Sequence, residues 1–399
     1  MAVADEANTP KTDAGRDKIF GLWTSFCQSV TVRPDLSDVQ GQETKLTYIL
    51  VFGLRYRREG QKNKSVTAGT VTDAILAVGK GIANLGQPDP RKQVQGEKRN
   101  HPLLAAFLRG LAKSDDPTKR SYPANVTIIE NLYQVLDTNH PVDGQANQHV
   151  INLTIAAYYW LLRPAEYTDS RDAGRSQAFH FRDVFFSIAM PNAPDKMVNA
   201  TDRSLNDVEE SRVRIATLTF TDQKNCVRGE KISQRATDNP DLCPCISIFR
   251  ITQHLREHNA PPATRLCDYY DSHGNLSSIK PGFITNGLRW SARHLKQYTG
   301  IDPFLLSARS LRPGGATALL CANIDSDVIM LLGRWKSNAM FRYLRVQALA
   351  HSVNLAQKML DHGKYTFAPS VYTKQADMPL PRETPVAFAE VLNHLEIED

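Results

Sequence analysis

The sequence contains no long apolar run and little cysteine. No stretch of about 18 apolar residues occurs, so we expect no membrane span. The opening MAVADEANTPKTDAGRDK has no apolar core and does not fit a secretory signal, so residues 1–15 are predicted to form a disordered lead. The six cysteines show no spacing typical of a disulfide framework, which favours a reducing compartment.

A metal site is the alternative that the cysteine positions leave open. Cys243 and Cys245 flank one proline, and His254 and His258 follow at helical spacing. Zinc sites mostly use a C-x₂₋₄-C spacing, and the histidine pair lacks the glutamate of an H-E-x-x-H motif. Free, partly buried cysteines and helix-surface histidines are therefore favoured, and we expect no metal and no cofactor.

Charge is unevenly distributed along the chain, whose net charge is +6. Residues 55–64 carry five basic residues and one acid, and residues 305–345 carry six basic residues and two acids, so each segment has a net charge of +4. From residue 376 onward, one basic and six acidic residues give −5. Two basic patches favour a polyanion held from two sides, with the acidic tail away from it or against another protein surface.

Apolar periodicity predicts a mainly α-helical protein with two domains. Short amphipathic helices over 17–30, 44–59, 67–86 and 101–117 predict a helical bundle in residues 16–115, followed by a polar linker over 116–123. Residues 124–363 are predicted to form a larger domain that combines helices with a small antiparallel sheet. Residues 364–399 are a proline-rich connector and a short terminal helix.

The larger domain has a distinct order of predicted elements. Its helices are predicted at 124–137, 148–166, 244–258, 316–322, 327–333 and 338–350, and its first two strands at 178–189 and 212–221. A hairpin with Asn225 and Gly229 as turn residues leads to a third short strand. Gly333 is expected to end the helix over 327–333, and Tyr343 lies on the helix that follows.

Four short motifs in this domain share one chemistry. Arg163 and Glu166 lie in LLRPAEYT, Lys224 in DQKNCVRG, Arg309 and Arg312 in SARSLRPGGAT, and Arg334, Trp335 and Tyr343 in GRWKSNAMFRYLR. In this order they resemble the tyrosine recombinase (phage integrase) family, whose pattern is R-x-x-E, a hairpin lysine, H-x-x-R followed by A-T, and G-H or G-W before the tyrosine. The resemblance covers roughly residues 16–363. Within the family, SLRPGGATALL and GRW look most like recombinases of eukaryotic mobile elements such as the crypton group.

This resemblance implies an enzyme that cleaves and rejoins DNA through a 3′-phosphotyrosine intermediate, with Tyr343 as the nucleophile. Arg163 and Arg312 would bind the two non-bridging phosphate oxygens through paired hydrogen bonds and stay charged at any working pH. Glu166 would orient Arg163 or hold the site from behind. Because the two guanidiniums stabilise the developing charge, no metal is required, and because the bond energy is stored in the phosphotyrosine, rejoining needs no ATP.

Proton transfer is where the sequence departs from the family pattern. Lys224 would protonate the departing 5′ oxygen, with Lys231 as the competing candidate. Arg309 stands where the family usually has histidine, and arginine can stabilise charge but cannot accept the tyrosine's proton. By spacing Arg334 replaces the family's His or Trp, whereas by chemistry Trp335 can still donate its indole N–H to a phosphate oxygen. Trp335 is slightly favoured.

The resemblance also implies that the partner is double-stranded DNA, gripped by phosphate contacts from both domains. The residues expected to make these contacts are Arg55, Arg57, Arg58, Lys62, Lys64, Lys336, Arg342 and Arg345. Recombination in this family proceeds through a Holliday junction in a tetramer, so we expect a homo-oligomer on DNA. The terminal helix would dock on a neighbouring subunit or pack on its own domain. The expected location is the nucleus of a eukaryote, or otherwise the cytoplasm or nucleoid.

Two other functions stay open. A type IB topoisomerase-like enzyme would use the same phosphotyrosine chemistry without exchanging strands between sites. A recombinase-derived DNA-binding protein that is catalytically impaired is favoured by Arg309 alone.

Overall fold

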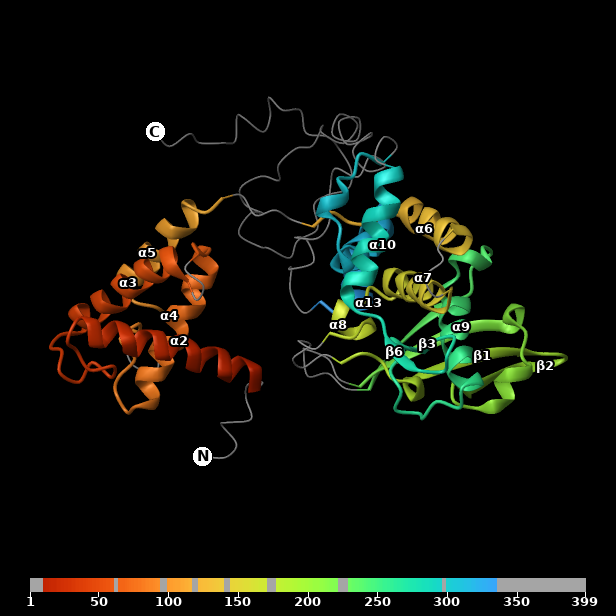
Figure 1. Ribbon diagram of the computed structural model, residues 1–399, viewed down its shortest axis with the longest axis horizontal. Coiled ribbons are helices and arrows are strands. Elements are labelled where there is room, and N and C mark those ends of the chain that lie inside the picture. Colours follow the sequence, from red (N-terminus) through yellow and green to blue (C-terminus); the bar gives the residue numbers. More distant parts are fainter. Residues whose placement is uncertain are drawn as a thin grey trace, which may run out of the picture. The chain divides into compact units, whose positions relative to one another are not determined.

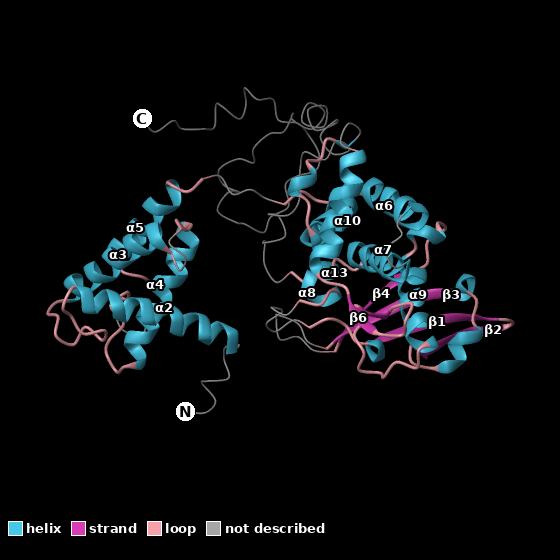
Figure 2. Ribbon diagram, viewed as in Figure 1, coloured by secondary structure: helices cyan, strands magenta, loops and turns pink. Residues whose placement is uncertain are grey.

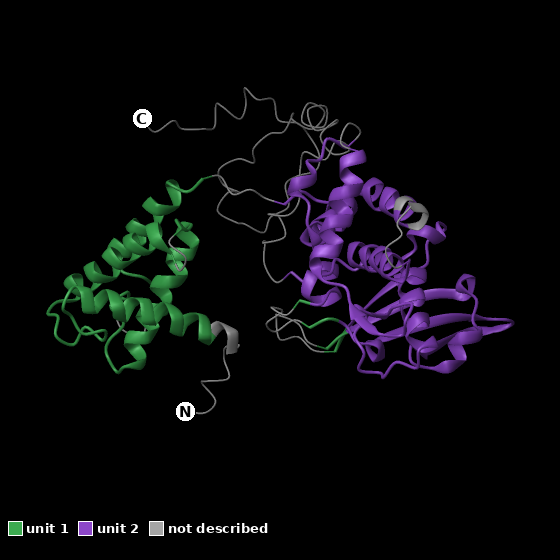
Figure 3. Ribbon diagram, viewed as in Figure 1, with its two compact units in different colours: residues 1–120, 170–178, 220–230 green, residues 121–169, 179–219, 231–399 purple. Residues whose placement is uncertain are grey.

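The computed structural model describes residues 10–60, 64–93, 99–116, 121–139, 144–170, 177–221, 229–295 and 299–335 (Figure 1). The prediction of a mainly α-helical fold with a small antiparallel sheet is confirmed (Figure 2). Unit 1 comprises residues 1–120, 170–178 and 220–230, and unit 2 comprises residues 121–169, 179–219 and 231–399 (Figure 3). The first boundary between them falls within the predicted linker, 116–123. Among the described helices, none has both the length and the apolar character of a membrane span.

Unit 1 is a helical bundle with an aromatic core. Its described helices are α2 (Pro10–Ser29), α3 (Gln42–Glu59), α4 (Ala68–Asn84) and α5 (Pro102–Lys113). The rings of Trp23 and Phe52 meet edge to face with centroids 5.4 Å apart, and Phe52 stacks on Tyr56 at 5.8 Å. Phe26 is buried in the same cluster, and burial of these four aromatic side chains stabilises so small a bundle.

Helix α2 begins earlier than the sequence predicts. Pro10 suits the first turn because its missing N–H would have no helical partner, and Asp13 suits the positive end of the helix dipole. The carboxylate of Asp13 also lies 3.3 Å from the guanidinium of Arg16. The predicted disordered lead over 1–15 is therefore wrong for residues 10–15, which are helical.

In unit 2, several helices pack around one long buried helix, α7. The helices are α6 (Val126–Asn139), α7 (Gly144–Tyr159), α8 (Pro164–Tyr167), α9 (Pro244–Glu257), α10 (Pro281–His294), α12 (Leu311–Cys321) and α13 (Ser326–Gly333). Helix α7 is buried from His149 to Tyr158 and packs against α6, α9 and α12. An element buried on all sides is a rigid support for groups placed at its ends.

The larger sheet has the order β2-β1-β3-β4. Its strands are β1 (Val184–Met190), β2 (Ala193–Asn199), β3 (Val213–Phe220) and β4 (Glu230–Arg235), and a separate antiparallel pair is formed by β5 (Asp268–Tyr270) and β6 (Leu276–Ser278). In the register, Phe186 of β1 lies opposite Val198 of β2 and Ala216 of β3. The ring of Phe186 also meets Phe249 of α9 at 5.3 Å, so α9 covers one face of this sheet (Figure 2).

Several elements of unit 2 differ from the prediction. The strand predicted over 178–189 begins only at Val184, because a 3-10 turn over Phe181–Asp183 precedes it. The Asp183 carboxylate holds this turn by accepting a hydrogen bond from the His180 backbone N–H at 2.9 Å. Strand β2, the β5–β6 pair and helix α10 were not predicted. The signal for α10 was present, since Ile284, Leu288 and Ala292 recur at helical spacing and are buried.

Candidate active site

The candidate site is built where α7 ends. One helix was predicted over 148–166, but α7 stops at Tyr159, Leu161 has a left-handed φ of +50°, and α8 begins at Pro164. A proline disfavours the helical conformation in the residue before it, and Arg163 is accordingly extended, with φ −80° and ψ 149°. The continuous helix is therefore wrong. The break leaves carbonyl groups at a helix end, where no amide four residues on can donate to them.

Glu166 holds Arg163 in place. The backbone N–H of Arg163 donates to Glu166 Oε2 at 2.8 Å, and its Nη1 donates to Oε1 at 2.7 Å. The side chain of Glu166 is 2% exposed, whereas that of Arg163 is 22% exposed. A buried carboxylate thus fixes the guanidinium while part of it stays accessible to an anion.

Arg334 binds the same carboxylate from the end of α13. Its Nη2 donates to Glu166 Oε2 at 3.0 Å, and the guanidinium also donates to the carbonyls of Trp160 at 3.2 Å and Leu161 at 3.3 Å. Figure 1 shows α8 beside the end of α13. Helix α13 ends at Gly333, as the sequence predicted, and the left-handed residue that caps it is Arg334, with φ 56° and ψ 41°.

Arg312 is fixed by carbonyls and by an aromatic ring. Its Nη1 donates to Leu161 O at 3.1 Å, and its Nη2 donates to the carbonyl of Gly333. The guanidinium carbon lies 4.3 Å from the ring centre of Trp335, which is a cation–π contact. Gly333 makes room for this ring, because an added Cβ would lie 1.7 Å from Cζ3 of Trp335.

Two glycines bring Arg312 close to the end of α7. An added Cβ at Gly314 would lie 2.0 Å from the Ala124 carbonyl oxygen, and one at Gly315 would lie 2.3 Å from the Tyr158 carbonyl oxygen. Only glycine permits such backbone approach, so these positions let α12 lie directly against its neighbours. Helix α12 begins at Leu311, whereas the predicted helix began at residue 316, so Arg312 is helical.

The structure brings five of the predicted catalytic residues together: Arg163, Glu166, Arg312, Arg334 and Trp335. Arg309 is exposed on the turn over Ala308–Ser310, and its guanidinium makes no hydrogen bond or ion pair with any described residue. The other predicted residues, Tyr343, Lys224, Lys62, Lys336, Arg342 and Arg345, lie outside the described residues, as does the helix predicted over 338–350.

The carbonyls of Trp160 and Leu161 are the part of the site that sequence reasoning missed. Each accepts a hydrogen bond from Arg334, and Leu161 accepts one from Arg312 as well. The available signal was Pro164, which predicts a helix stop and hence unpaired helix-end carbonyls nearby. Lys231, the alternative to Lys224, is exposed on β4 with its amino group 5.4 Å from the ring centre of Phe185.

The basic segment of unit 1 divides into paired and unpaired side chains. Arg57 pairs with Asp115, which also accepts from the Ala68 amide at 2.9 Å, and the hydrogen bond from Arg57 is the main cause that lowers the pKa of the Asp115 carboxyl. Arg57 therefore ties α3 to the start of α4 and the end of α5. Arg58 and Lys64 are exposed, without a carboxylate partner among the described residues.

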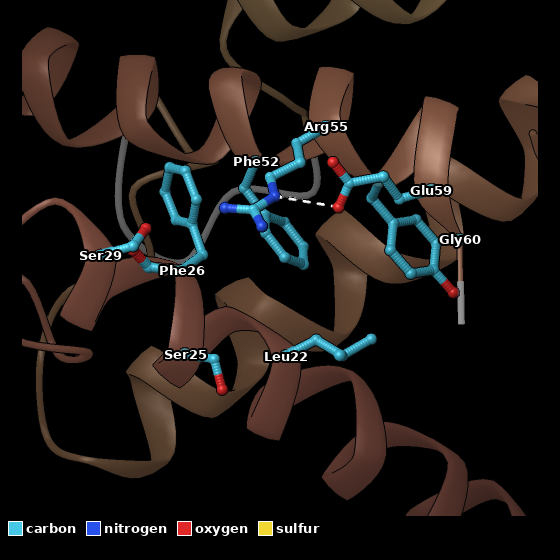
Figure 4. Close-up of a pocket in the computed structure, with 9 residues that line it drawn as sticks. Leu22, Ser25, Phe26, Ser29, Phe52, Arg55, Glu59 and Gly60 are labelled. Atoms are coloured by element: carbon cyan, nitrogen blue, oxygen red, sulfur yellow. Dashed lines mark hydrogen bonds and ion pairs between the residues drawn. The ribbon is translucent and has the colours of Figure 1, made fainter. Parts of the chain in front are cut away.

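Arg55 lies over a groove between α2 and α3 (Figure 4). Its Nε lies 3.0 Å from a carboxylate oxygen of Glu59, and both side chains are about half exposed. The groove has a volume of about 150 Å³, and Leu22, Phe26 and Phe52 line it. An exposed pair within one helix is weak, so the Arg55 guanidinium can exchange its partner at little cost.

No group of three or more His, Cys, Asp or Glu suited to a metal ion occurs in the part of the chain that the structure describes. Cys243 and Cys245 are buried and free, and Cys245 Sγ donates to the Gln234 carbonyl at 3.1 Å. The neighbouring Cys245 thiol is the main cause that lowers the pKa of Cys243 to about 5, whereas the pKa of Cys245 is raised. A zinc site at this pair would lack further ligands among the described residues.

Comparison with known proteins gives structural neighbours only. No protein-family model and no curated protein matches the chain. Among solved structures, the chain is similar to the Tn1549 transposon integrase in complex with transposon right end DNA, with 11% identity and a TM-score of 0.41 over 86% of this chain and 99% of that chain. It is also similar to the same integrase in complex with circular intermediate DNA, with 12% identity and a TM-score of 0.42 over 86% of this chain and 98% of that chain.

Proposed function

We propose that this chain is a tyrosine recombinase of a mobile element, which cleaves and rejoins DNA through a 3′-phosphotyrosine. The observation that carries the proposal is the convergence of Arg163 and Arg312, from distant motifs, at the end of α7. Glu166 fixes one guanidinium, and carbonyls with the Trp335 ring fix the other. Donors that are fixed before substrate binds stabilise developing charge without reorganising during the reaction.

The proposed chemistry assigns a role to each fixed group. Arg163 and Arg312 bind the two non-bridging oxygens of one phosphate, on which negative charge rises as the phosphorus is attacked. The Tyr343 phenol loses its proton to solvent, and its oxygen forms a bond to phosphorus while the bond to the 5′ oxygen breaks; Lys224 gives that 5′ oxygen a proton. Attack by a 5′-hydroxyl on the phosphotyrosine reverses these steps and releases Tyr343.

The finer proposals concern the substrate, the assembly and the origin of the chain. We propose that the substrate is double-stranded DNA, that strand exchange proceeds through a Holliday junction in a homo-tetramer, and that the element is of the crypton type. The two segments of net charge +4 support a polyanionic partner, and the nuclear location follows only from this function.

A nicked suicide substrate tests the proposal, because loss of a short 3′-side fragment traps the covalent intermediate. We expect a protein–DNA adduct that survives denaturing electrophoresis, and we expect Tyr343→Phe to abolish it. DNA binding without any adduct from the wild-type chain would exclude the catalytic proposal. An adduct that persists in Tyr343→Phe would instead assign the nucleophile to another residue.

The second candidate is a DNA-binding protein that no longer cleaves. Arg309 favours it, because arginine is no general base and this guanidinium is exposed, with no hydrogen bond or ion pair to a described residue. The type IB topoisomerase-like alternative is separated by a substrate with two sites. A recombinase exchanges strands between the sites, whereas a topoisomerase relaxes supercoils and exchanges nothing.

Deletion of residues 385–399 tests the role of the terminal helix. Docking on a neighbouring subunit predicts loss of multimers on DNA, whereas packing on its own domain predicts unchanged assembly.

A further inference from the structure

We infer that Arg334 is a positioning residue rather than a phosphate ligand: it fastens the end of α13 to Glu166 and thereby sets Arg163. The inference rests on the function proposed above, because it assigns Arg334 a role within the same site. Spacing alone put Arg334 at the position where the resembled family has a His or Trp that faces the phosphate. The contacts of its side chain point to a different role.

The first argument is that the hydrogen-bonding capacity of the Arg334 guanidinium is already used. Nη1 donates to the carbonyls of Trp160 at 3.2 Å and Leu332 at 3.1 Å, and Nη2 donates to Leu161 O at 3.3 Å and Glu166 Oε2 at 3.0 Å. Four of the five N–H groups of an arginine lie on these two nitrogens. A phosphate oxygen could bind them only by displacing carbonyls or a carboxylate.

The second argument is burial. The side chain of Arg334 is 3% exposed, and its Nε is buried as well. Arg163, by contrast, has a side chain that is 22% exposed and bonds Glu166 through one terminal nitrogen. The two arginines therefore share one carboxylate but differ in access: part of Arg163 is exposed to solvent, whereas Arg334 is enclosed.

The third argument is the backbone. Arg334 has a left-handed φ of 56°, which is unfavourable for a residue with a Cβ and persists only where its surroundings enforce it. This conformation turns the guanidinium inward and directs the next residue, Trp335, onto Arg312 at 4.3 Å. One residue thus sets both anion-binding guanidiniums, Arg163 through Glu166 and Arg312 through Trp335.

A double-mutant cycle on the adduct assay tests the inference. Arg334→Met, Glu166→Gln and the double variant are compared in single-turnover adduct formation and in the dependence of DNA affinity on salt. We expect Arg334→Met to slow adduct formation by roughly 10- to 100-fold, and to cost no more than about 3-fold when Glu166 is already Gln, because residues that act through each other are not additive. The salt slope should not change, since no phosphate contact is lost.

Controls separate this role from a loss of folding. Arg250→Met removes another arginine–glutamate pair of unit 2, with contacts of 2.8 Å to Glu210, and should leave the adduct rate unchanged. Arg334→Lys keeps the charge but lacks the planar guanidinium, so it should slow adduct formation as Arg334→Met does. If Arg334→Met does not fold, Arg334→Lys takes its place in the cycle. The inference is overturned if the rate losses of the two single variants multiply in the double variant. It is also overturned if Arg334→Met lowers the salt slope of DNA affinity by about one unit, as loss of a phosphate ligand would. Absence of any adduct from the wild-type chain would instead overturn the proposed function.

Discussion

Glu166 Oε2 and Arg334 Nη2 lie 3.0 Å apart although the residues are 168 positions apart in the chain, and both side chains are almost wholly buried. Desolvation of two charges is costly, so such a pair is a poor source of net stability. Its value is geometric, because it joins the segment that carries Arg163 to the segment that leads to Trp335. Removing Glu166 would take away the carboxylate that the buried Arg334 binds, whereas removing Arg334 would leave Glu166 paired with Arg163.

Close packing of α12 should depend on Gly314. Gly314→Ala would place a Cβ 2.0 Å from the backbone oxygen of Ala124, so we expect a loss of about 1–3 kcal/mol in the free energy of unfolding. Gly282→Ala, in the first turn of α10, meets no atom within 4 Å and should be neutral or stabilise by up to about 1 kcal/mol. Urea unfolding of both variants measures the difference, and equal stability would contradict the close contact.

Two neighbouring arginines of α3 should differ in what they support. Arg57→Met should lower the thermal midpoint of unit 1, because Asp115 loses its guanidinium partner. Arg58→Met should leave the midpoint unchanged and lower DNA affinity, with the salt slope reduced by about one if Arg58 contacts a phosphate. Thermal melting and binding titrations at several salt concentrations make the comparison. The reverse pattern would mean that Arg57 leaves Asp115 to bind DNA.

Arg309→His should accelerate adduct formation. The side chain is exposed and makes no hydrogen bond or ion pair with a described residue, so the substitution should cost little stability. An imidazole at this position could accept the proton of Tyr343, and general-base catalysis typically contributes about 10²–10⁴-fold. We expect a gain of at least about 10-fold at pH 7.5, lost as the pH falls below about 6.5, where the imidazole is protonated. A rate that is unchanged at both pH values would place the proton acceptor elsewhere.

Acid should destabilise unit 2 through His149. Burial is the main cause that lowers the pKa of His149 to about 4, and its Nε2 lies 2.7 Å from the Leu266 carbonyl. Between about pH 6.5 and 4 the unfolded chain binds a proton that the folded chain does not, so the free energy of unfolding falls as the pH is lowered. The contribution is full above pH 6.5, and about 3 kcal/mol is lost by pH 4. His149→Gln should lose less stability than wild type between pH 7.5 and pH 5 in urea unfolding, and equal losses would contradict the assignment.

The features that the sequence predicted well are those set by residues close together in the chain. The helices of unit 1 and the strand over 212–221 follow from apolar periodicity, which depends on neighbours in the chain. Arg163, Glu166 and Arg312 could be named because they lie in short motifs that resemble a known family pattern. The prediction of a single helix through residue 166 failed because it followed apolar content and overlooked Pro164.

What the sequence did not predict depends on tertiary contacts. Strand β2 has five exposed residues in succession at the sheet edge and therefore lacks an alternating pattern. The assignment of Arg334 could not be made by counting positions from Tyr343. It depends on Glu166 and on helix-end carbonyls that come close only after α7, α12 and α13 have packed together.

The close approach at Gly314 also has a mechanical consequence. The chain enters unit 2 along residues 121–124, where the Tyr122 amide donates to Leu305 O at 3.1 Å and the Ala124 amide donates to Ser310 O at 3.0 Å. Together with the contact between Gly314 and the Ala124 carbonyl, these bonds clamp the incoming strand to the helix that bears Arg312. A force applied to residues 121–124 would therefore reach helix α12 within one turn of Arg312.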